Sequence, residues 1–145
     1  MKLLLQRVRE ARVDVHGETV GRIGPGLLVF VGVQKDDDER AVARLAERLV
    51  GYRVFSDEQG RMNRDVREAG GALLLVSQFT LAADTGKGRR PSFSGAAEPA
   101  RAEQLYEALI AAVEARGVTV ARGRFGADMQ VHLVNDGPVT FLLEL

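Results

Sequence analysis

The stretch Asn135-Asp136-Gly137-Pro138-Val139-Thr140 lies near the end of the chain and separates two apolar runs, residues 129–134 and 139–145. Both runs have the length and composition of β-strands. Asn-Asp-Gly is typical of a hairpin turn, but such a turn needs no proline after the glycine. Proline fixes φ, lacks an N–H and forms the only peptide bond with an appreciable cis population, while glycine leaves no Cβ near an approaching group. We therefore predict a stiff corner with little side-chain bulk, which contacts either its own core or a ligand.

Around this corner the chain is rich in strands and has two helices. Acidic residues begin a helical pattern at residues 37–50, and Pro99 begins a second one that runs to residue 116. Extended segments are predicted at residues 2–16, 19–23, 27–33, 53–55, 72–76 and 118–122. Because strands and helices do not alternate regularly, we predict a single α+β domain over residues 1–145, with a strongly curved or barrel-like β-sheet and two main helices.

The composition narrows the possible classes of function. The chain has 145 residues, of which 46% are hydrophobic, so it can form one domain with a substantial core. Its 20 basic and 20 acidic residues give no net charge, which argues against a protein that coats DNA or long RNA but not against one that grips an RNA end. The chain has no cysteine and only two histidines, so we expect no disulfide, no metal and no cofactor.

The N-terminus begins with a short apolar run at residues 3–5. Arg7, Arg9 and Arg12 interrupt it at once, so it is neither a signal peptide nor a membrane span. We expect the mature protein to start near Met1 and to be cytoplasmic.

A polar stretch, Ser77-Gln78-Phe79-Thr80, follows a buried-looking strand. Its hydroxyls and backbone N–H groups could form a substrate pocket that binds a developing oxyanion, or the stretch could be an ordinary polar strand end. A Ser/His/Asp triad is not favoured, because no nucleophile-elbow glycine pattern surrounds Ser77, and His16 and His132 fall at a turn and on a strand surface. A Thr80 nucleophile would need an adjacent base, which the motif does not supply.

Residues 82–98 form the longest irregular segment, and loops of this length in a compact domain are usually functional or disordered. Lys87, Arg89 and Arg90 make a basic patch within it. The patch could contact phosphate groups or could be a solvated loop, and the sequence alone leaves both interpretations open.

Two motifs, residues 77–81 and residues 135–140, resemble the two signature motifs of the D-aminoacyl-tRNA deacylases. Similar residues also occur at Gln6-Arg7-Val8, Arg61-Met62-Asn63, Gly88-Arg89-Arg90-Pro91-Ser92-Phe93 and Phe125-Gly126-Ala127-Asp128-Met129. The resemblance covers essentially the whole chain. Ala82 departs from it, because many relatives carry a larger side chain there, which affects pocket packing rather than the reaction.

The resemblance implies an enzyme that proofreads tRNA by hydrolysing the ester between a D-amino acid and the 3′-terminal adenosine. Glycine attached to tRNA is also a substrate of this family. Family members are homodimers, in which a cis Gly-Pro pair enters the pocket of the other subunit and rejects L-amino acids by steric exclusion. The tRNA 2′-hydroxyl can assist, so the protein need only position the ester and stabilise its oxyanion.

Carried over to this chain, the resemblance assigns the following site residues. Ser77, Gln78, Phe79 and Thr80 form the catalytic pocket; Gly137 and Pro138 face it from the partner chain; Arg7 braces that pair; Phe125 and Met129 line the adenosine side. We expect the aminoacyl-tRNA 3′ end and a second copy of the chain as partners, with no membrane and no DNA.

Three alternatives stay open at this point. A sister family with the same fold carries its Gly-Pro pair in trans and tolerates small L-amino acids. A non-catalytic RNA-end-binding module, or an editing module attached to a synthetase, would bind without this reaction. The last alternative is an esterase with Thr80 as its nucleophile.

Overall fold

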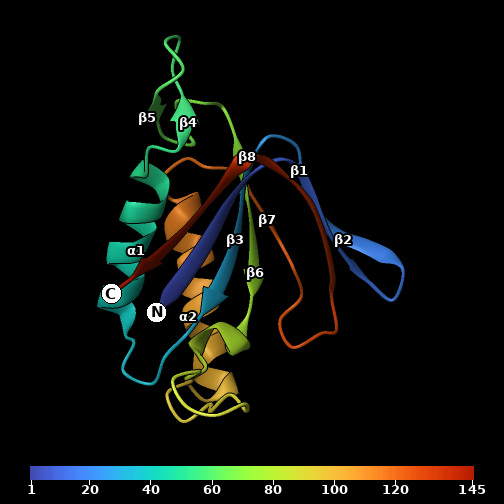
Figure 1. Cartoon of the computed structure of the whole chain (residues 1–145), viewed down its shortest axis with the longest axis vertical. Helices are drawn as coiled ribbons and strands as arrows, with labels where there is room; N and C mark the ends of the chain where they lie inside the picture. The colour runs from blue at the N-terminus through green and yellow to red at the C-terminus, as the bar shows by residue number, and fades with distance from the viewer.

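A long first strand organises the main β-sheet (Figure 1). This strand, β1 (Lys2–Val15), pairs antiparallel along one edge with β3 (Gly26–Gly32) through residues 2–8 and with β2 (Glu18–Ile23) through residues 11–15. Along its other edge it pairs antiparallel with β8 (Gln130–Glu144). Strands β6 (Ala72–Ser77) and β7 (Val120–Arg122) continue the sheet from β3 in parallel. The computed structural model describes residues 1–145.

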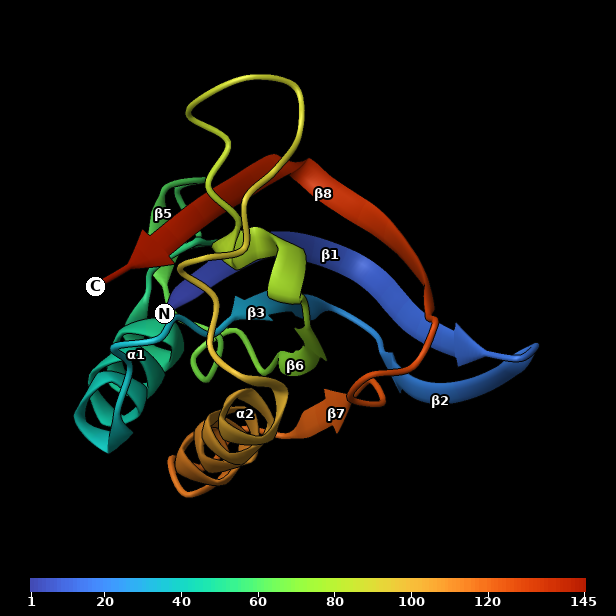
Figure 2. The same ribbon diagram turned by 90° about the horizontal axis from the view of Figure 1, so that it is seen from below.

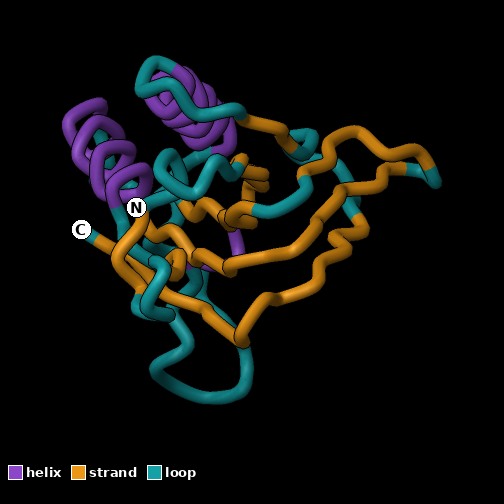
Figure 3. The backbone as a smooth tube through the Cα atoms, turned by 90° about the horizontal axis from the view of Figure 1, so that it is seen from above, coloured by secondary structure: helices purple, strands orange, loops and turns teal.

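The sheet curves until its two ends almost meet, as Figure 3 shows from above. At the meeting point, β2 lies so close to β7 that a Cβ on Gly21 would clash with the carbonyl oxygen of Arg122. Glycine in a strand allows this close approach of two backbones. The predicted α+β domain with a barrel-like sheet is therefore confirmed.

Two helices, α1 (Glu39–Gly51) and α2 (Pro99–Glu114), cover the same side of the sheet (Figure 2). The Asp38 side chain caps α1 by accepting a hydrogen bond of 3.0 Å from the Ala41 N–H, and Pro99 occupies the first turn of α2. Both predicted helices are confirmed to within two residues at each end. They bury a row of leucines against the sheet, including Leu45 and Leu105. A smaller apolar core fills the curve of the sheet itself.

The corner of the opening stretch lies within one strand and not in a hairpin turn. Strand β8 runs through it without a break and stays paired with β1 on both sides. Thr140 pairs with Gln6 and Asn135 pairs with Val8, so the four residues 136–139 lie opposite Arg7 alone. The corner is thus a bulge in one long strand, because both apolar halves find the same partner.

Smaller elements complete the chain. A short hairpin joins β4 (Phe55–Ser56) to β5 (Met62–Arg64), of which only the first strand was predicted. Strand β6 ends at Ser77 and passes into a 3₁₀ helix, η1 (Phe79–Ala82). Neither α1 nor α2 has the length and hydrophobicity that a membrane-spanning helix requires.

Candidate active site

A cavity of about 380 Å³ opens at the carboxyl end of β6, where the polar motif begins. Ten of its fifteen lining residues are hydrophobic, so its walls are apolar and its polar groups are few, as in most small-molecule sites. The lining includes five predicted site residues, namely Ser77, Gln78, Phe79, Phe125 and Met129. The fold thus brings two distant sequence segments to one cavity.

Hydrogen bonds fix the turn that carries the polar motif. The Gln78 N–H donates to the Val31 carbonyl oxygen at 2.8 Å, and the Gln78 carbonyl oxygen accepts from the Leu81 N–H at 3.1 Å. The Gln78 side-chain amide donates to the hydroxyl oxygen of Thr80. Thr80 is exposed and stands beside the cavity rather than in its lining. The polar groups are therefore held on a turn that is anchored to the neighbouring strand β3.

Phe125 and Met129 form the wall supplied by the segment between β7 and β8. The ring of Phe125 packs on that of Tyr106 with their centroids 6.0 Å apart. The Tyr106 hydroxyl donates to the Leu75 carbonyl oxygen at 2.8 Å, and burial raises the pKa of this phenol to about 12. Met129 lies over Gly123, where any Cβ would stand only 2.8 Å from the methionine sulfur. A neutral, buried tyrosine thus supports this wall from behind.

Asp128 also lines the cavity and is its only ionisable side chain. It was not among the predicted site residues. Its position between Phe125 and Met129, in a segment that resembles the family, could have indicated a place in the site. A single aspartate in a loop, however, has no distinctive spacing that would single it out.

Arg7, Gly137 and Pro138 form a second group, apart from this cavity. Arg7 donates from Nη1 to the Val54 carbonyl oxygen at 2.7 Å and from Nε to the Asp136 carbonyl oxygen at 2.9 Å. The Gly137–Pro138 peptide bond is cis, the isomer that the resemblance implies, and both residues are exposed. Neither lines the cavity beside Ser77 of its own chain.

The corner is fixed from the other side by Asn135. Its side-chain oxygen accepts from the Val139 N–H at 2.8 Å, and its amide donates to Gln6 at 2.9 Å and to the Thr140 hydroxyl at 3.1 Å. Gly137 has a φ of +147°, and an added Cβ would lie 2.6 Å from the Val139 side chain. Only glycine fits this backbone without displacement.

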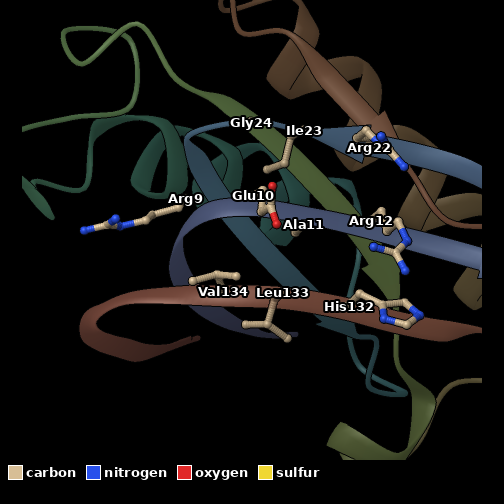
Figure 4. Close-up of a pocket in the computed structure, with 10 residues that line it drawn as sticks. All are labelled: Arg9, Glu10, Ala11, Arg12, Arg22, Ile23, Gly24, His132, Leu133 and Val134. Carbon is tan, nitrogen blue, oxygen red and sulfur yellow. The ribbon is translucent and has the colours of Figure 1, made fainter.

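A second cavity, of about 430 Å³, lies over β1, β2 and β8 (Figure 4). Arg9, Arg12, Arg22 and His132 line it. His132 stands 3.4 Å from Asp14, whose pKa is lowered by a hydrogen bond from the Thr19 hydroxyl. None of the predicted site residues lines this cavity.

The chain's ionisable groups do not form a triad or a metal centre. Neither His16 nor His132 makes a hydrogen bond with Ser77 or Thr80, and no group of three or more His, Asp or Glu side chains could hold a metal ion. The only side chain that contacts the Thr80 hydroxyl is an amide, which is not a base. The site therefore offers hydrogen bonds and shape rather than an activated nucleophile.

Known proteins resemble this chain over its full length. The family model described as D-Tyr-tRNA(Tyr) deacylase matches residues 4–144. A D-aminoacyl-tRNA deacylase from Alcanivorax borkumensis is 63% identical over all 145 residues of both chains, and one from Alkalilimnicola ehrlichii is 64% identical over 97% of this chain and 94% of its own. A solved structure titled c-Myc DNA Unwinding Element Binding Protein shares 36% identity and a TM-score of 0.95, covering 100% of this chain and 99% of that one. By these matches the chain belongs to the D-Tyr-tRNA(Tyr) deacylase family.

Proposed function

We propose that this chain is an enzyme that hydrolyses the ester bond between a D-amino acid and the 3′-terminal adenosine of a tRNA, releasing both. The observation that carries the proposal is the apolar cavity at the end of β6, with its few fixed polar groups, in a chain with full-length relatives named D-aminoacyl-tRNA deacylase. The reaction is a carboxylic ester hydrolysis, and the enzyme proofreads tRNA in the cytoplasm without a cofactor.

The bound ester would lie across the cavity. The adenosine rests on the wall formed by Phe125 and Met129, where an aromatic ring and a thioether offer a flat apolar surface. The ester carbonyl then points at the turn that begins at Gln78. A helical turn leaves its first N–H groups without partners inside the turn, so those of Phe79 and Thr80 can donate to a developing oxyanion.

This arrangement does not need a catalytic base. The Thr80 hydroxyl is hydrogen-bonded only to the Gln78 amide, so nothing in the chain draws the proton from it. An aminoacyl ester is already reactive, and the neighbouring ribose 2′-hydroxyl assists the attack of water. The protein contributes position and oxyanion stabilisation.

The chirality filter is the Gly137–Pro138 corner of a partner subunit in a homodimer. Three observations support this role. The corner is exposed, Arg7 and Asn135 hold it by hydrogen bonds from both sides, and it does not line the cavity of its own chain. A rigid corner above the Cα of the bound amino acid excludes an L side chain by contact. Glycine has no side chain to exclude, so glycyl-tRNA is also hydrolysed.

The outer face of β8 supports association of two copies. Val134 and Leu142 expose 46% and 45% of their surface on this strand, on either side of the corner. Exposed apolar side chains beside a functional segment are typical of an interface. A second copy placed here would cover them and present its corner to the first.

The direct test is incubation of the purified chain with tRNA charged with a D-amino acid, its L enantiomer or glycine. We expect release of the D-amino acid and of glycine, with the L ester left intact. Tight binding of charged tRNA without release would instead identify an RNA-end-binding module, and rapid release of small L-amino acids would identify the sister activity.

A further inference from the structure

The loop of residues 84–92 lies between η1 and α2, and its two ends are hydrogen-bonded to each other. At its neck, the Asp84 N–H donates to the Ser92 carbonyl oxygen at 2.7 Å, and the Ser92 N–H donates back to Asp84 at 2.9 Å. The Asp84 side chain also accepts from the Gly86 N–H at 2.8 Å. Figure 2 shows the loop arching away from η1 and past β8. The fold thus presents this loop outward from the end of the sheet where the cavity lies.

The tip of the loop carries three cations that nothing in the chain neutralises. Lys87, Arg89 and Arg90 are all exposed, and none of them makes an ion pair or a side-chain hydrogen bond. The one acidic residue of the loop, Asp84, already accepts the hydrogen bond from Gly86 at the neck. By contrast, Arg101 near the start of α2 is paired with Glu39 at 2.9 Å. The loop therefore presents positive charge to a partner outside the chain.

Two exposed aromatic rings stand at the base of the same loop. Phe79 and Phe93 expose 63% and 40% of their surface, and their ring centroids lie 5.3 Å apart. Phe79 also lines the cavity, so the pair connects the site to the loop. Cations that track a backbone, combined with aromatic rings on which bases stack, are the means by which proteins hold single-stranded nucleic acid.

We propose that loop 84–92 binds the backbone phosphates of the single-stranded tRNA 3′ end, and that Phe79 and Phe93 stack on a base next to the terminal adenosine. The inference rests on the proposed function, because it extends the same substrate beyond the cavity. Lys87 lies three residues beyond Asp84, so it stands at most about 11 Å from the neck. None of the three cations lines the cavity, so they meet phosphates upstream of the terminal nucleotide and not the ester. An acidic peptide would satisfy the charges but would offer no bases for the two rings.

Binding of uncharged tRNA isolates this contact from catalysis. We compare the full chain with an Arg89→Gln/Arg90→Gln variant and with a matched Arg44→Gln/Arg48→Gln variant, which removes the same charge from the exposed face of α1. The loop variant should bind about tenfold more weakly, and the slope of log affinity against log salt should fall by about 1.4, roughly 0.7 for each lost phosphate contact. The α1 variant should match the unchanged protein. Phe93→Leu should weaken binding at least fivefold with little change in slope, as expected for lost stacking.

Turnover of a D-aminoacyl-adenosine, which has no phosphate, completes the test. The loop variant should hydrolyse it at the unchanged rate while kcat/KM on D-aminoacyl-tRNA falls about tenfold. Equal loss on both substrates, or tRNA affinity equal to that of the α1 variant, would overturn the inference. Failure of the unchanged protein to hydrolyse either ester would refute the proposed function instead, and the affinity comparison would still decide the role of the loop.

Discussion

Arg7 donates a hydrogen bond of 2.9 Å from its Nε to the Asp136 carbonyl oxygen, and it does so where the register between β1 and β8 shifts between Gln6 and Val8. The same guanidinium reaches Val54 through Nη1. A single arginine thus fills the gap that the bulge of residues 136–139 opens opposite β1. The planar fork of arginine suits this double contact better than a lysine would. The corner is therefore built as a fixed part of the sheet.

Replacing Gly137 by alanine should damage activity because its Cβ would lie 2.6 Å from the Val139 side chain and 2.8 Å from the Val139 backbone nitrogen, in a backbone with φ of +147°. We expect kcat/KM on D-aminoacyl-tRNA to fall by at least tenfold, with roughly 1–3 kcal/mol lost from the free energy of unfolding. Gly51→Ala is the control, since nothing lies within 4 Å of an added Cβ there. Turnover that is unchanged in Gly137→Ala would show that the corner is only a structural bulge.

Thr80→Ala should retain substantial activity, because the Thr80 hydroxyl contacts only the Gln78 amide and has no base beside it. The expected fall in kcat is less than about tenfold, the size of one lost neutral hydrogen bond. Single-turnover rates with D-aminoacyl-tRNA measure it. Complete loss of turnover in a folded variant that still binds substrate would favour Thr80 as a nucleophile.

Tyr106 should make the protein sensitive to alkali. Its pKa in the folded protein is about 12, above the ordinary value of 10.0. The contribution of the neutral phenol to the free energy of unfolding is therefore complete below pH 10 and is lost as pH rises toward 12. The loss should reach roughly 2–3 kcal/mol of unfolding free energy. Denaturant titrations across this window should show the decline in the unchanged protein and in Tyr52→Phe. The same decline in Tyr106→Phe would assign it to other groups.

The proposed homodimer, in which each site is shared between two subunits, predicts recovery of activity in mixed dimers. A Gly137→Ala chain keeps its cavity, and a Gln78→Ala chain keeps its corner, so a hybrid of the two holds one complete site. Co-expression with two affinity tags isolates the hybrid. Because one of its two sites is restored, it should show about half of the unchanged activity, while each variant alone is impaired. No recovery in purified hybrids would place the whole site within one chain.

The order of helices and strands could be predicted from local sequence, but the shape of the corner could not. Acidic residues before α1 and Pro99 at α2 mark helix starts by local chemistry, which needs no knowledge of the rest of the fold. Asn-Asp-Gly marks a change of direction in the same local way. Whether its flanking strands pair with each other or both with β1 depends on contacts more than a hundred residues away, such as Asn135 with Gln6.

The same limit applies to the site. The polar motif at residues 77–80 was visible in the sequence, but spacing could not bring Phe125 and Met129 to it. Only the pairing of β6 with β7 does so, because it leads the segment after β7 past the end of β6. The short strand Met62–Arg64 was missed for a different reason, since three residues carry too little periodicity to indicate a strand.

The most direct measurement is the ratio of initial rates at which one preparation releases D-tyrosine and L-tyrosine from the same tRNA. We expect rapid release of D-tyrosine, no release of L-tyrosine above the spontaneous rate, and release of glycine from its own tRNA. Equal release of the two enantiomers, or release of neither, would contradict this expectation.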